Sequence, residues 1–156
     1  MDRLAKVLYA EKTLSAEFFN FFQSATGSER GTSMSALTIL AKDHPKFLAN
    51  HLDFIVEQIN AKEPRVKWEA SECIAILAPV FPDRVVLAIP RLLKNMSDDG
   101  TVVKWTTALA LTEVAKANPA THQQLLPLFE KAVVKEDNNG VRKVYEKFLK
   151  TVFKKK

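Results

Sequence analysis

Residues suited to catalysis or metal binding are few and poorly spaced in this chain. His44, His51 and His122 show no spacing typical of a zinc site, and no cysteine lies near them in sequence. The single cysteine, Cys73, lies among apolar residues, where a thiol behaves as a small hydrophobic group. The four glycines are dispersed and form no phosphate-binding motif. We therefore expect no catalytic, metal-binding or cofactor-binding residues.

Two identical dipeptides, Lys67-Trp68 and Lys104-Trp105, lie 37 positions apart (67 to 104). Tryptophan and arginine contribute much of the binding free energy of protein interfaces when they are desolvated. The dipeptides therefore indicate a partner-binding surface. Its candidate residues are Lys67, Trp68, Glu72, Lys104, Trp105, Leu109 and Arg142.

Proline positions extend the same interval over most of the chain. Pro45, Pro82 and Pro119 follow one another at this spacing, and Pro90 and Pro127 repeat it in a second register. Because two sets of prolines and both Lys-Trp pairs share one interval, we predict an internal repeat.

Each repeat is predicted to contain two helices. Apolar residues at spacings of three and four indicate the first, as at Leu52, Ile55 and Ile59. A polar turn precedes the second, and we expect second helices over about 29–42, 66–78, 102–117 and 141–153. No segment alternates as a strand does, so we predict an all-α protein. The second-helix core positions are Val66, Ala70, Cys73, Ile74 and Leu77, then Val103, Thr107, Ala110, Leu111 and Val114.

The prolines are expected at two places in the first helices. Pro45, Pro82 and Pro119 suit the first turn, where the missing N–H costs nothing. Pro90 and Pro127 fall in the interior, where a proline removes a hydrogen bond at about 3 kcal/mol and bends the helix. We therefore predict kinked first helices.

Three motifs open the later second helices: Glu63-Pro64-Arg65-Val66-Lys67, Gly100-Thr101-Val102-Val103-Lys104 and Asn138-Asn139-Gly140-Val141-Arg142. With these motifs and the paired helices, the chain resembles the HEAT repeats. The resemblance implies one domain over residues 1–156, built as a right-handed α-α superhelix, or solenoid, of about four helix pairs. The implied units are 9–45, 46–82, 83–119 and 120–153, with a basic tail at 154–156.

The resemblance also implies a function, that of a non-catalytic scaffold or adaptor which binds a protein or peptide on its concave face. Trp68 and Trp105 are expected on that face, which the second helices line. The alternative is structural, with each ring packed against the neighbouring repeat beside a ladder of ion pairs. The bases of that ladder are Lys67, Lys104 and Arg142, and its acids are turn residues such as Glu63 or Asp99.

An enzymatic alternative comes from the HEAT-like alkylpurine DNA glycosylases, which hold a cationic base between concave tryptophans beside an acid. Trp68 and Trp105, with Glu69 and Glu72, are the only residues here that imitate this arrangement. The family pattern is not matched residue by residue. We therefore expect a protein that is not an enzyme, with glycosylase activity the least favoured alternative.

The formal net charge of +5 is concentrated near the C-terminus. Residues 141–156 carry seven basic residues against Glu146, a local charge of +6, so the remainder carries about −1 (5 − 6). Lys143, Lys147, Lys150 and Lys154 form a basic patch on one amphipathic helix. A solvated surface capping the stack is the simplest interpretation, and nucleic-acid binding is the alternative.

Aromatic residues near the N-terminus need a cover. Phe19 and Phe21 point away from the predicted core, and we expect a short helix around Leu4, Val7 and Leu8 to pack over them. The alternative is self-association, or partner binding, through the two rings.

Membrane insertion and export are not expected. The longest uncharged apolar stretch, Cys73 to Pro82, has half the length that a bilayer span needs, and the first residues lack a hydrophobic signal core. One cysteine forms no intramolecular disulfide. We therefore predict a cytoplasmic protein.

Overall fold

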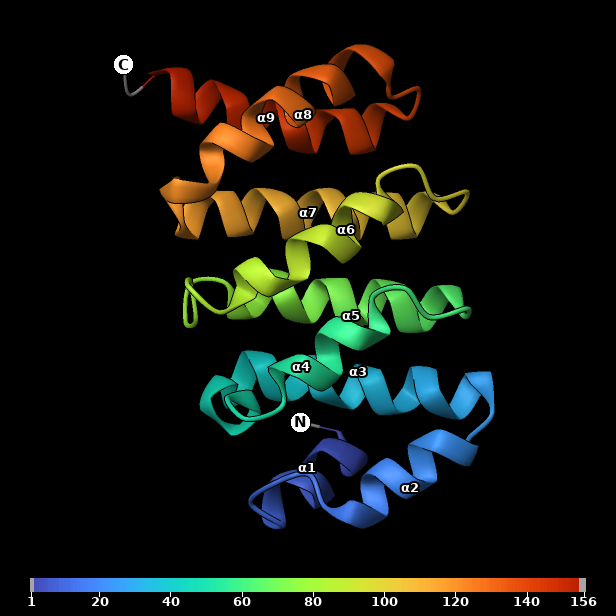
Figure 1. Ribbon diagram of the computed structural model, residues 1–156. Helices are drawn as coiled ribbons and strands as arrows, with labels where there is room; N and C mark the ends of the chain where they lie inside the picture. The colour runs from blue at the N-terminus through green and yellow to red at the C-terminus, as the bar shows by residue number, and fades with distance from the viewer. Residues whose placement is uncertain (1, 155–156) are drawn as a thin grey trace.

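The computed structural model describes residues 2–154, which fold into α-helices and short 3₁₀-helices without a β-strand (Figure 1). The all-α prediction is therefore confirmed. The α-helices are α1 (Arg3–Ala10), α2 (Ala16–Ser24), α3 (Gly27–Asp43), α4 (Leu52–Gln58), α5 (Pro64–Leu77), α6 (Ile89–Asn95), α7 (Thr101–Ala117), α8 (His122–Lys135) and α9 (Asn139–Lys154). The 3₁₀-helices are η1 (Pro45–Leu48), η2 (Val85–Ala88) and η3 (Pro119–Thr121). Within these residues, no helix is both long and apolar enough to cross a bilayer.

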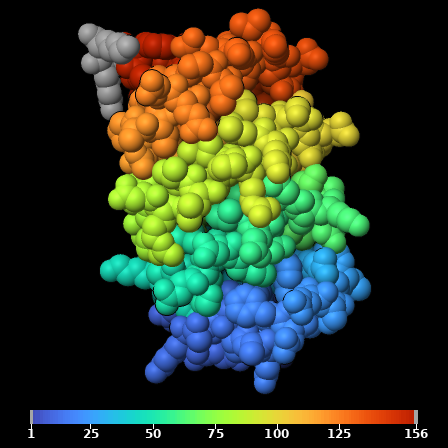
Figure 2. Space-filling view, in the orientation of Figure 1, coloured from blue at the N-terminus to red at the C-terminus, as the bar shows by residue number. Residues whose placement is uncertain are grey.

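The helices form two layers (Figure 1). In one layer α3, α5, α7 and α9 lie side by side in chain order, each in contact with the next. In the other layer α4, α6 and α8 cross in front of the long helices, and each packs against the long helix that follows it. Figure 2 shows this front face, where successive segments of the chain form successive bands. The candidate binding residues lie on three of the long helices, α5, α7 and α9.

Local capping makes the long helices begin earlier than expected. A capping box starts α3, because Thr26 Oγ1 accepts a hydrogen bond from the Glu29 amide while Glu29 Oε1 accepts one from the Thr26 amide. Pro64 occupies the first turn of α5, where its fixed φ suits a helix. Before α9, Asn138 Oδ1 accepts from the Val141 amide at 3.0 Å.

The prolines depart from expectation at two positions. Pro45 and Pro119 open η1 and η3, so they do occupy a first turn, although of a 3₁₀-helix. Pro82 instead lies in a turn before η2. The predicted kink at Pro90 is wrong, because the chain changes from η2 to α6 just before it and Pro90 lies in the first turn of α6. Pro127 lies inside α8, as predicted.

One continuous hydrophobic cluster runs from α1 to α9. Every predicted core position of the second helices in α5 and α7 is buried. The first-helix positions Leu52, Ile55 and Ile59 are buried as well. In α8, Leu125 and Phe129 are fully buried, whereas Leu126 is only partly buried. The apolar spacing therefore predicts most of the core.

The expected cover over the N-terminal phenylalanines is incomplete. Phe19 is half-buried because its ring makes an edge contact with Phe54 of α4, at 5.2 Å between centroids. Phe21 is 46% exposed and borders a small cavity beside Leu4. Helix α1 packs against α3 and leaves Val7 exposed, so it does not shield both rings. Self-association through Phe21 stays a prediction.

We expect Leu111→Ala to lower the free energy of unfolding by about 2–5 kcal/mol, because a fully buried leucine of α7 leaves a cavity among its neighbours. Leu87→Ala is the matched control, since Leu87 is 62% exposed and its truncation changes stability by about 0.5 kcal/mol or less. Urea unfolding followed by circular dichroism measures both. Equal effects of the two substitutions would contradict the core described here.

Candidate partner-binding surface

The two tryptophans of the repeated dipeptide differ in exposure. Trp68 on α5 is half-buried, whereas Trp105 on α7 exposes 43% of its surface. Identical local sequence therefore gives two different environments. Trp105 has more surface free for a partner than Trp68 has.

Trp105 borders a groove between α7 and α9. The floor of the groove is apolar and includes Leu109 of α7 with Val144 and Phe148 of α9. Its volume is about 340 Å³, enough for one or two side chains. The remaining lining residues are polar or charged, namely Thr112, Glu113, Lys116, Lys147 and Thr151.

The repeated position of Lys67 and Lys104 has a structural explanation, because both lysines are ion-paired. Lys67 Nζ lies 2.7 Å from Asp98 Oδ1, and Lys104 Nζ lies 2.8 Å from Glu136 Oε1. All four side chains are mostly buried. Each lysine of a long helix thus reaches the turn that precedes the next long helix. These lysines connect neighbouring segments and are not free to bind a partner.

The acids of this ladder are not the expected ones. Asp98, one residue before Asp99, receives Lys67, and it also accepts a hydrogen bond from the Gly100 amide. Glu63 pairs instead with Arg30 of α3, at 3.6 Å. The reason is that each basic side chain reaches forward along the chain. It pairs with an acid 31 to 33 positions later, in the turn before the next long helix, and not with an acid in the turn before its own helix.

Arg142 belongs to the same ladder through different atoms. Its guanidinium donates to the Glu136 carbonyl oxygen at 3.0 Å and to Asn139 Oδ1 at 2.7 Å. Glu146 lies 3.6 Å away on the next turn of α9. Arg142 therefore holds the start of α9 and is not available as a binding residue.

Hydrogen bonding keeps two ladder acids ionised. Burial by itself would raise the pKa of Asp98, but hydrogen bonds from Lys67 and the Gly100 amide outweigh it and lower that pKa. In Glu136, burial is likewise outweighed by hydrogen bonds from Lys104 and the Asn138 amide, so its pKa is also lowered.

The acids expected in a glycosylase-like site are engaged by α3. Glu69 Oε2 accepts a hydrogen bond from Thr38 Oγ1 at 2.7 Å, and Glu72 lies 3.6 Å from Lys42 Nζ. Thr38 also lies 3.2 Å from Cys73 Sγ. Burial raises the pKa of the Cys73 thiol to about 12, so Cys73 is a protonated core residue.

The predicted basic patch lines a second groove, along α9. Lys143, Lys147, Lys150 and Lys154 are all exposed, and with Glu146 and Thr151 they border a volume of about 450 Å³. No carboxylate within residues 2–154 forms a salt bridge with these four lysines. Residues 155 and 156 of the predicted basic tail lie outside the described residues.

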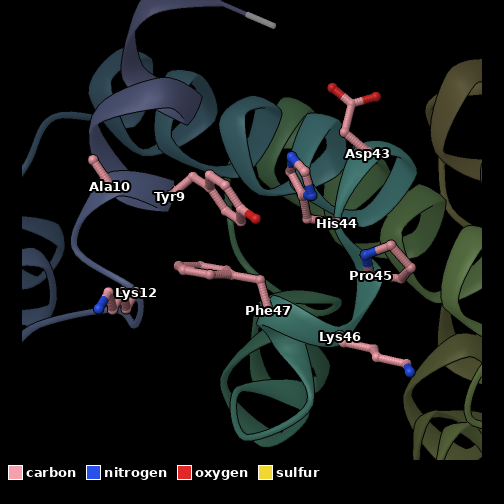
Figure 3. A pocket seen from close by; sticks show the side chains of 8 residues that line it. All are labelled: Tyr9, Ala10, Lys12, Asp43, His44, Pro45, Lys46 and Phe47. Carbon is pink, nitrogen blue, oxygen red and sulfur yellow. The ribbon is translucent and has the colours of Figure 1, made fainter.

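A further cavity, which the sequence did not indicate, lies beside the ends of α1 and α3 (Figure 3). Its volume is about 810 Å³. The rings of Tyr9 and His44 stack at 3.8 Å between centroids, and Phe47 lies at 5.9 Å from Tyr9. Lys12 at its edge has a φ of 68°, in the left-handed region. Tyr9 and His44 are 35 positions apart (9 to 44), which differs from the repeat interval, so the repeat does not predict that these two residues meet.

The histidines have structural partners. His51 Nε2 lies 3.0 Å from Thr13 Oγ1, and burial lowers the pKa of His51. His122 Nε2 donates to the Ala115 carbonyl oxygen at 2.8 Å. Across residues 2–154, no group of three histidine, cysteine or acidic side chains is arranged to hold a metal ion.

Comparison with known proteins returns no match to a family model, to a curated protein or to a solved structure.

The ladder acids predict an acid-dependent loss of stability. Because Asp98 and Glu136 have lowered pKa values in the folded state, their contribution is present above about pH 4 and is lost as the pH falls through their folded values. We expect the double variant Asp98→Asn/Glu136→Gln to be less stable at pH 7 and to lose less further stability between about pH 5 and about pH 2.

Thermal unfolding across this pH range measures the effect. The matched control is Asp53→Asn/Glu130→Gln, which changes one aspartate and one glutamate at exposed positions. It should follow the wild-type pH profile. If the ladder variant and the control lose stability in parallel, the ladder does not contribute as described.

Proposed function

We propose that the chain is a HEAT-like α-solenoid, a right-handed superhelix that serves as a non-catalytic scaffold or adaptor for a polypeptide partner. The 37-residue interval and the chain-order packing of α3, α5, α7 and α9 support the architecture. In such a stack each unit buries its apolar side against its neighbours, and an extended face is left for binding. The proposed binding face is the solvent-facing side of the long helices.

The observation that carries this proposal is the exposed ring of Trp105 beside an apolar groove. A large aromatic side chain is usually buried when its role is packing, yet Trp105 is 43% exposed. Tryptophans at the edge of an apolar pocket are typical of positions that contribute strongly to protein interfaces. The groove accepts a side chain of a partner, with Trp105 and Leu109 as its α7 contacts.

The binding site proposed here is narrower than the sequence prediction. Lys67, Lys104 and Arg142 are engaged in the ladder, and Glu72 is paired with Lys42. Trp105 and Leu109 retain the binding role, and Trp68 contributes less because it is half-buried. The centre of the surface therefore moves toward α7 and α9.

Nucleic-acid binding is the second candidate function. The observation that favours it is the groove of four exposed lysines along α9. Phosphate binding along the whole face is disfavoured by Glu69 and Glu72 on α5 and by Glu113 on α7. Glycosylase activity has less support, because Glu69 and Glu72 are both engaged by α3.

We also propose a cytoplasmic location. The single cysteine is buried and protonated, which suits a protein that does not depend on disulfides.

Trp105→Ala tests the polypeptide-binding proposal. Short random peptides displayed on phage are selected on the immobilised wild-type protein, and their affinities are measured for purified variants. We expect Trp105→Ala to weaken binding by about thirtyfold or more, or about 2 kcal/mol, because the ring is desolvated by the partner. Its effect on the free energy of unfolding should be about 1 kcal/mol or less, since the ring is exposed.

Leu87→Ala is the control, because it removes an exposed apolar side chain on η2, away from the groove. It should leave the affinities unchanged. Peptides that bind both variants as well as wild type would show that the Trp105 groove is not the binding site. A loss of several kcal/mol in the stability of Trp105→Ala would support a packing role instead.

A further inference from the structure

The apolar groove and the lysine groove are two parts of one surface. Lys147 and Thr151 of α9 line both. On one side of these residues lie Val144 and Phe148, which face the apolar groove with Trp105. On the other side the lysines continue along the helix. A partner that occupies one groove therefore extends directly into the other.

Most of the positive charge of this surface lies along α9, and Lys116 of α7 adds one further lysine beside the apolar groove. Lys67 and Lys104 are neutralised by Asp98 and Glu136. Glu146, which borders the lysine groove, is itself shared with Arg142 at 3.6 Å. The four exposed lysines of α9 thus present uncompensated charge beside the apolar floor. The chemistry that complements this surface is an apolar side chain flanked by carboxylates.

We propose that the surface binds an acidic polypeptide segment, whose apolar or aromatic anchor enters the Trp105 groove while its carboxylates face the α9 lysines. This inference rests on the proposed polypeptide-binding function and specifies its partner. The anchor contributes most of the affinity, because it is desolvated in the groove. The carboxylates contribute orientation, association rate and salt dependence, because the lysines are exposed.

The length of the lysine groove sets the length of the acidic segment. Lys143 and Lys154 are 11 positions apart (143 to 154) on a helix that rises about 1.5 Å per residue, so the groove is about 16 Å long. An extended peptide covers this length with about five residues. The segment is therefore short, with its acidic residues within a few positions of the anchor.

Nucleic acid is the competing occupant, and the surface suits it less well. A phosphate backbone gains affinity from each basic side chain that it contacts, and here all of those side chains except Lys116 lie on a single helix. Acidic side chains border the adjoining part of α7 and the lysine groove itself, at Glu113 and Glu146. A polypeptide fits this mixture of basic and acidic side chains better, because only some of its residues are charged and these need not lie beside the glutamates.

Peptide selection on phage tests the inference, using the full chain. The peptides selected on wild type should carry an aromatic or large aliphatic residue next to two or more acidic residues. Their affinity should fall about tenfold in the variant with four substitutions, and it should also fall between about 50 and about 300 mM NaCl. The four substitutions are Lys143→Gln, Lys147→Gln, Lys150→Gln and Lys154→Gln.

A matched control removes the same charge elsewhere. Its exposed lysines are Lys6, Lys62, Lys94 and Lys131, each changed to glutamine. None of them lines either groove. Peptide affinity for this control should stay within about twofold of wild type.

The outcomes separate this inference from the function on which it rests. Neutral or basic peptides that need Trp105 but tolerate the α9 variant would overturn the acidic partner and leave the polypeptide-binding function standing. Peptides indifferent to Trp105→Ala, or no selected peptides at all, would overturn both. Oligothymidylate binding that is lost in the α9 variant but kept in Trp105→Ala, without acidic peptides, would assign the surface to nucleic acid and overturn the inference.

Discussion

Polar contacts between segments about one repeat interval apart hold the helices in register. Asn95 donates to the Ile59 carbonyl oxygen at 2.7 Å, Asn118 donates to the Pro82 carbonyl oxygen at 3.1 Å, and Lys67 pairs with Asp98. These contacts join residues 31 to 36 positions apart, and consecutive long helices also pack against each other. Hydrophobic burial favours stacking but does not fix the alignment, whereas a buried amide or ion pair is satisfied in only one alignment.

This division of roles explains which charged residues are left for binding. A lysine whose ion pair with the following turn aligns two segments is not free to bind a partner, as at Lys67 and Lys104. The four exposed lysines of α9 form no salt bridge among the described residues. Four lysines without a salt bridge therefore lie together on α9, next to the groove bordered by Trp105.

Sequence periodicity predicts the helices and most of the core, because burial follows the spacing of apolar residues along each helix. It does not predict the partners of polar side chains. Asp98 and Asp99 are adjacent, and only the three-dimensional path of the turn selects Asp98 for Lys67. The unequal exposure of Trp68 and Trp105 depends on the side chains that neighbouring helices present, which the interval does not encode. The separation of Tyr9 and His44 does not match the repeat interval, so the interval does not predict the stacking of their rings.

The difference between the two tryptophans has an optical consequence. Indole emission moves to longer wavelength in polar surroundings, so the 43% exposed Trp105 emits to the red of the half-buried Trp68. A molecule that seats against α7 removes water from Trp105 and shifts the spectrum toward the blue, whereas one that binds beside Tyr9 leaves the spectrum unchanged. The protein thus carries its own fluorescent reporter, which distinguishes binding at the Trp105 groove from binding at the Tyr9 cavity without a label.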